Sequence, residues 1–94
     1  MVSEINLAVP LYRDHVDHDR IDHEAGEPVW SQLTQILRGQ IARGEIQPGK
    51  LLPSTRTLMQ RYEVSDGTVK RAIAKLRDEG LVESVPGRGT FVRK

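Results

Sequence analysis

Between Glu63 and Leu81, hydroxyl, acidic and basic side chains are spaced as they would be at the start of a helix that faces an anion. Ser65 can cap this helix, Thr68 falls in its first turn, and Lys70 lies about one turn further in. Hydroxyls and helix N-terminal amides suit phosphates, and a basic side chain at this place suits the acceptor atoms of guanine. Asp66 is unexpected, because an acid lies where an anionic partner would dock.

Other chemistry finds less support in the residues. The chain has no cysteine, which excludes disulfides, thiolate metal sites and cysteine nucleophiles. Gly87-Arg88-Gly89 is too short for a nucleotide-binding fingerprint, and 94 residues leave little room for an enclosed active site. His15 and His18 could share a helix face, but no third metal ligand is fixed. We expect no enzyme, no metal and no cofactor.

The net charge of +1 conceals two segments of opposite charge. Residues 1–27 hold two basic and seven acidic residues, a net of −5, and residues 28–94 hold twelve basic and six acidic residues, a net of +6. This asymmetry indicates an acidic, disordered N-terminal extension and a basic domain for a nucleic acid or membrane surface; the alternative is a solvated basic surface without a partner. No leader or membrane span is evident, so we expect a cytoplasmic protein with no membrane partner.

Three helices are expected to position the candidate groups. The first covers about residues 29–43, the second residues 55–62 after a Ser54 cap, and the third about residues 65–79 after the Ser65 cap. The apolar stripe of the first helix consists of Trp30, Leu33, Leu37 and Ile41. The second helix can turn Leu58, Met59 and Tyr62 inward, and the third Val69, Ala72, Ile73 and Leu76. This periodicity is typical of helices that bury one face.

A small hairpin should follow the helices. Two strands, about residues 81–85 and 90–93, flank a turn at 86–89, and Leu51-Leu52 could add a short strand. Two helices joined by a three-residue turn and followed by a glycine-flanked Arg88 are the parts of a winged helix-turn-helix. The fold class is therefore mainly α with a small β hairpin: three helices plus a two- to three-stranded wing.

The segment "GEIQPGKLLPSTRTLMQRYEVSDGTVKRAIAKLRDEGLVESVPGRGTFV" resembles the DNA-binding domain of GntR-type bacterial transcription regulators. The matching positions are Gly44, Pro48-Gly49, Leu52-Pro53-Ser54, Arg56, Leu58, Val64-Ser65, Thr68-Val69, Ala72, Leu76, Gly80-Leu81, Gly87, Gly89 and Phe91-Val92. The match runs from about Pro28 to Val92 without a gap. The resemblance implies sequence-specific binding of double-stranded DNA by a transcription regulator, and favours a repressor.

The resemblance also implies roles for individual residues. Arg56 would contact a base or phosphate, Ser65 and Thr68 would bind phosphate, Lys70 would replace a base-reading arginine, and Gly87 with Arg88 would form the wing tip. The DNA-binding candidates are Ser54, Arg56, Ser65, Asp66, Gly67, Thr68, Lys70, Arg71, Gly87 and Arg88. Two alternatives stay open: Ser65 acts as a cap and no more, or the Thr68 hydroxyl bonds to the preceding turn.

Asp66 and Gly67 depart from the family pattern, which most often has arginine and threonine there. Asp66 has three interpretations: it favours the helix dipole, it pairs with Lys70 four residues later, or it accepts a hydrogen bond from the amino group of a cytosine. Gly67 would shift base reading toward Arg56, Lys70 and the wing. Lysine at 70 also lacks the bidentate fork of arginine.

Several functional questions stay open at this point. Family members usually carry an effector-binding or oligomerisation domain after the wing, and the chain ends at Lys94, so we expect no effector domain here. On DNA a homodimer on a two-fold operator is expected, within the nucleoid. Rival interpretations are a protein-interaction module and a plasmid or phage accessory protein. The acidic extension could fold back over the basic surface or be inert.

Overall fold

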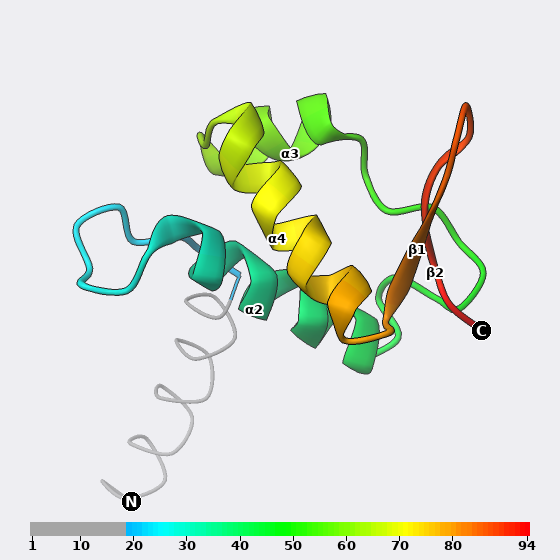
Figure 1. Ribbon diagram of the computed structural model, residues 1–94. Coiled ribbons are helices and arrows are strands. Elements are labelled where there is room, and N and C mark those ends of the chain that lie inside the picture. Colours follow the sequence, from blue (N-terminus) through cyan, green and yellow to red (C-terminus); the bar gives the residue numbers. More distant parts are fainter. Residues whose placement is uncertain (1–18) are drawn as a thin grey trace, which may run out of the picture.

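The computed structural model describes residues 19–94 (Figure 1). Its elements, in chain order, are α2 (Val29–Ala42), α3 (Thr55–Tyr62), α4 (Asp66–Asp78), β1 (Val82–Val85) and β2 (Gly89–Val92). Helix α4 crosses α2, and the hairpin rises beside both helices. The prediction of three helices followed by a wing is confirmed.

The helix ends follow from local residues. Ser54 and Ser65 cap α3 and α4, as predicted. Pro28 precedes α2 without any side-chain cap, and Gly44, in the left-handed conformation at φ 79°, follows its end. Glu63 ends α3 at φ 56°, a conformation that costs a non-glycine residue energy. The three-residue turn between α3 and α4 therefore contains backbone strain that the sequence did not reveal.

The core lies where the apolar stripes of the helices meet the hairpin. Its buried residues are Leu33, Ile36, Leu37, Leu52, Leu58, Tyr62, Val69, Ala72, Ile73, Leu76, Val82 and Val92. The predicted inward face of α4 is confirmed in full. Trp30, Ile41 and Met59 are half-buried rather than fully buried, because they lie at the margins of their stripes.

The wing is an antiparallel pair with a partial third strand. Val82 pairs with Val92 and Val85 with Gly89, one residue from the predicted bounds at three of the four strand ends. Leu51 forms an isolated bridge to Phe91, and the preceding loop adds backbone hydrogen bonds to β2. The short strand expected at Leu51-Leu52 is thus a single bridge that fastens this loop to the wing.

Residues 19–27 pack against the helices. The side chain of Gln32, which is buried, accepts from the Asp22 amide at 2.8 Å and donates to the Asp22 carbonyl at 2.9 Å. His23 Nε2 lies 3.3 Å from the Tyr62 carbonyl oxygen, and Ile21 packs on the core. The packed structure therefore begins before Pro28. Disorder of residues 1–18 stays a prediction, because these residues lie outside the described part of the chain.

Candidate nucleic-acid interface

Helices α3 and α4 begin with the same hydroxyl arrangement. Ser54 Oγ accepts from the Thr57 amide at 3.1 Å and donates to Thr57 Oγ1 at 2.9 Å. Ser65 Oγ accepts from the Thr68 amide at 3.1 Å and donates to Thr68 Oγ1 at 3.0 Å. The Thr68 hydroxyl is therefore bonded to the cap that precedes its turn, as one of the two alternatives predicted. Its oxygen accepts from Ser65, and its own proton can still be donated to a phosphate.

The first turn of α4 is open to solvent. The amides of Asp66 and Gly67 precede the first intrahelical hydrogen bonds and point away from the helix. Lys70 Nζ lies 3.0 Å from Asp66 Oδ2, and the two side chains are 70% and 53% exposed. The predicted pairing is confirmed, and Asp66 occupies the position that favours the helix dipole. An exposed pair of this kind contributes about 0.2–0.5 kcal/mol, so a ligand can replace it at small cost.

Gly67 has no steric reason to be glycine. A Cβ built at this position would meet Ser65 Oγ at 4.0 Å, an ordinary contact, and nothing nearer. Its backbone is helical, so a larger residue would also be tolerated conformationally. The missing side chain therefore leaves free space on the outer surface of α4, beside the exposed Asp66.

Two arginines of the candidate set differ in their surroundings. Arg56 lies exposed in the first turn of α3, within one turn of the Ser54 cap. Arg71 is exposed too, but its guanidinium carbon lies 4.3 Å from the centroid of the Trp30 ring in α2. The structure thus turns Arg71 toward α2, away from Lys70. Trp30 was predicted as an apolar stripe residue, and no sequence signal placed it at Arg71.

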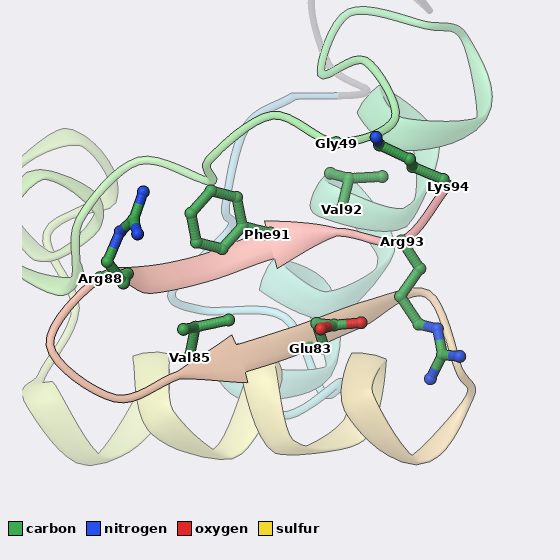
Figure 2. A pocket seen from close by; sticks show the side chains of 8 residues that line it. All are labelled: Gly49, Glu83, Val85, Arg88, Phe91, Val92, Arg93 and Lys94. Atoms are coloured by element: carbon green, nitrogen blue, oxygen red, sulfur yellow. The ribbon is translucent and has the colours of Figure 1, made fainter.

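The wing tip presents Arg88 between two glycines. Gly87 and Gly89 have φ angles of 77° and 120°, in the region that disfavours side chains, and the Arg88 amide closes the turn onto the Val85 carbonyl at 2.9 Å. A Cβ at Gly89 would approach Leu51 Cδ2 to 2.9 Å. Figure 2 shows Arg88 beside Phe91 at the tip end of an open pocket of about 510 Å³, far from Lys94 at its other end. The glycines fix a narrow, basic tip.

The ion pairs whose members have shifted pKa values lie away from the candidate DNA-binding residues. Arg38 of α2 donates to both carboxylate oxygens of Glu79 at 2.9 and 2.7 Å, and these hydrogen bonds hold the pKa of Glu79 below its usual range. The hydrogen bond to Glu45 raises the pKa of Arg43. These pairs are at the far end of α4 and at the end of α2, so they do not engage the candidate DNA-binding residues.

Metal ligation is not evident in the described residues. Across residues 19–94 no group of three or more histidine and acidic side chains could hold a metal ion. His15 and His18 lie outside this range. Within the same range no helix is long and apolar enough to cross a membrane.

The arrangement matches a known family. The family model described as "Bacterial regulatory proteins, gntR family" matches residues 30–92. The chain belongs to this family. The matched relatives are named as transcription regulators rather than enzymes, in line with the prediction that the chain does not catalyse a reaction.

The family relatives include named repressors. Over 74 residues, 39% are identical to the HTH-type transcriptional repressor NagR of Bacillus subtilis, covering 79% of this chain and 30% of NagR. The repressor YtrA of the same organism is 33% identical over 73 residues, covering 78% of this chain and 56% of YtrA. The chain thus spans about a third to half of the length of these relatives.

Solved structures share the fold. AraR(DBD) in complex with operator ORX1 superposes with a TM-score of 0.71 at 31% identity, over 78% of this chain and 96% of the other. YtrA from Sulfolobus acidocaldarius, a GntR-family transcription factor, gives a TM-score of 0.73 at 36% identity, over 81% and 80% of the two chains. The winged helix predicted from the sequence is confirmed by this likeness.

Proposed function

We propose that this chain binds double-stranded DNA as the winged helix-turn-helix of a sequence-specific transcription regulator, a repressor that works in the bacterial cytoplasm. One observation carries the proposal: the capping serines of α3 and α4 are held by hydrogen bonds within their own turns, and exposed cations lie beside them and at the wing tip. The likeness to AraR(DBD) bound to operators and to named repressors supports it.

In this proposal α4 enters the major groove with its N-terminal turn first. Thr68 and the amides of Asp66 and Gly67 bind phosphate, with Ser65 orienting the Thr68 hydroxyl. Ser54 caps α3 and so presents Arg56 to a base or phosphate. Lys70 reads a base, and the wing tip, Gly87-Arg88, contacts the adjacent groove or the backbone.

Asp66 gives this surface a distinct sequence preference. Released from Lys70, its carboxylate accepts a hydrogen bond from a cytosine amino group, where an arginine would contact guanine. Gly67 leaves space beside it for the base edge. Site selection from random DNA with wild type and Asp66→Arg tests this role: we expect the two proteins to select different bases, and an unchanged site would refute it.

The DNA proposal is tested by a titration against salt. Residues 1–94 are titrated into a selected duplex at several salt concentrations, with fluorescence anisotropy as the measurement. A monomer with about four to six phosphate contacts should give a log–log slope of roughly −4 to −5. A slope near zero would reject DNA binding and leave a protein-interaction module as the alternative.

The proposed assembly is a homodimer on a two-fold operator. Two wings and two recognition helices can then engage half-sites about one helical turn apart. Sedimentation of the protein with a full site and with a half-site is expected to give two chains and one chain per duplex. One chain on the full site would contradict the pairing.

A second proposal concerns the acidic extension, which we propose weakens non-specific binding by competing for basic groups. The ion pair between Asp19 and Arg43, at 3.2 Å, shows that an acid near this extension can pair with a basic group of the helices, although Arg43 is not a candidate DNA-binding residue. The DNA affinities of chains 1–94, 19–94 and 28–94 should be compared at low salt. Chain 19–94 keeps the hydrogen bonds between Asp22 and Gln32, so it separates loss of the acidic residues 1–18 from loss of these packing contacts. Tighter binding by 19–94 than by 1–94 is expected, and equal affinities would favour an inert leader.

A further inference from the structure

Two neighbouring cations of α4 are held by different partners. Consecutive helix residues diverge by about 100° around the axis, so Lys70 and Arg71 face different directions. Lys70 is held within its own helix by Asp66 at 3.0 Å. Arg71 instead lies over the ring of Trp30, 4.3 Å from the centroid, well within the roughly 6 Å limit for a cation–π interaction. The direction of Arg71 is thus set by another helix.

The ring of Trp30 is presented by a rigid frame. Trp30 lies in the first turn of α2, where its carbonyl accepts from Thr34 Oγ1 at 2.8 Å. Leu33, three residues later, and Ala72, next to Arg71, are both fully buried. Because α2 and α4 pack against each other through such residues, the backbones on both sides of the stack are fixed. The side chain of Arg71 therefore has a defined platform.

The stack leaves the hydrogen-bonding edge of Arg71 unused. A guanidinium that lies on an aromatic face keeps its N–H donors in its own plane. Among residues 19–94, no oxygen accepts a hydrogen bond from Arg71, although the side chain is exposed. An ion pair would have consumed these donors, as Glu79 does for Arg38. The geometry is that of a cation held ready for an outside acceptor.

We propose that Trp30 is a positioning residue for DNA binding: its indole face holds Arg71 so that the guanidinium contacts a phosphate on the α2 side of the recognition helix. This inference rests on the proposed DNA binding. The contact adds affinity without reading bases, because phosphate contacts carry no sequence information directly. Lys70 and Asp66, on the other side, are left to read the bases.

The test combines DNA binding with a readout that needs no DNA. Salt titration on the selected duplex compares wild type with four variants: Trp30→Leu, Arg71→Gln, the double variant and the conservative Trp30→Tyr. Thermal unfolding of each variant gives its folded fraction. Trp30 is the single tryptophan of the chain, so its fluorescence emission reports directly on the stack. Arg71→Gln should shift this emission in the free protein.

The expected pattern is non-additive. Trp30→Leu and Arg71→Gln should each weaken binding by about three- to tenfold, and the double variant should bind like Arg71→Gln alone. The salt slope should lose about 0.9 in Arg71→Gln, a change that a loss of stability would not produce. Trp30→Tyr should retain most of the affinity, and all variants should select the same site.

Four results would overturn the inference. Additive losses in the double variant would mean that Trp30 acts without Arg71. An emission shift in Arg71→Gln with unchanged affinity and salt slope would mean that the stack is present but binds no phosphate. Wild-type binding that does not depend on salt would reject the proposed function and this inference together, whereas salt-dependent wild-type binding with unaffected variants rejects the inference alone.

Discussion

The two ends of α4 hold their charged side chains in different ways. At the N-terminal end, Asp66 and Lys70 pair with each other within one turn of the same helix. Beyond the C-terminal end, Glu79 accepts two hydrogen bonds from Arg38 of α2. Close to that end, Arg77 donates to Ser84 of β1 at 2.9 Å. One end is organised by its own sequence, and the other is tied to two further elements.

This difference separates two tasks along one helix. Local, exposed contacts can be exchanged for a ligand without disturbing the fold, because each contributes only tenths of a kcal/mol. The contacts of Glu79 and Arg77 instead join α4 to α2 and β1, so their loss affects how the elements are held together. Substitutions at the N-terminal end should therefore change DNA binding, and those at the C-terminal end should change stability.

The largest expected effect is on stability, from Leu76→Ala in the C-terminal half of α4. Leu76 is fully buried, so the substitution leaves a cavity and should lower the free energy of unfolding by about 2–5 kcal/mol. Urea unfolding measures this change, and Leu51→Ala, at a leucine that is 51% exposed, is the matched control. DNA affinity per folded molecule should be unchanged. A comparable loss of unfolding free energy in both variants would mean that burial of Leu76 does not account for its effect on stability.

The next effect is on binding, from Lys70→Gln. Loss of a base contact should weaken binding about 10- to 100-fold, equivalent to roughly 1–3 kcal/mol, with little change in unfolding. Lys75→Gln is the control, because Lys75 lies on the same helix but near Glu79, at 3.9 Å. Anisotropy titrations should show a clearly smaller loss for the control. Equal losses would mean that both ends of α4 contact DNA.

Two glycines, Gly67 in the first turn of α4 and Gly80 just after its end, test the difference between the two ends through the backbone. Gly67→Ala should raise the free energy of unfolding by up to about 1 kcal/mol, because Gly67 is helical and has space for a methyl group. Gly80→Ala should lower it, because Gly80 has a φ of 78°. Thermal unfolding of both variants decides the signs. A destabilised Gly67→Ala would show that the N-terminal turn is constrained by more than its cap.

The smallest effect is a pH dependence at the C-terminal end. Since Arg38 lowers the folded-state pKa of Glu79 below the unfolded value, the pair stabilises the fold above the unfolded pKa. This stability is lost as the pH falls through the folded-state pKa. We expect Glu79→Gln to lose less free energy of unfolding than wild type over that acid range, as measured by urea unfolding at several pH values. Identical profiles would contradict a role for the pair in stability.

Much of the fold followed from short-range patterns. The Ser54 and Ser65 caps set the starts of α3 and α4, and the buried residues of α4 follow its apolar period. The hairpin was placed to within one residue at each end, because glycines at 87 and 89 mark the turn. The predicted roles of Arg56, Thr68 and Arg88 at DNA stay predictions, although the structure places all three at the surface or its margin.

Other features could not be found in this way. Nothing in residues 19–27 signals that Asp22 shares two hydrogen bonds with a buried Gln32, ten positions along the chain. The left-handed conformation of Glu63 at the end of α3 was equally invisible, because glutamate is not a residue type that signals a positive φ. The acidic composition of residues 1–27 suggested a solvated segment. The hydrogen bonds between the Asp22 backbone and Gln32 instead show that packing begins before Pro28.

The sequence by itself determined the winged helix, the family and the serine caps, and it offered the pairing of Asp66 with Lys70 as one of three interpretations. The caps and this pairing depend on residues a few positions apart, whose geometry is fixed by the helix period and by hydrogen bonds to the nearby backbone. The fold and the family followed from motif residues spread between Pro28 and Val92. Only the tertiary structure decided that Arg71 lies on Trp30 and that Arg38 holds Glu79. These contacts depend on how α2 crosses α4, which is set by the interlocking of buried side chains rather than by any spacing along the chain.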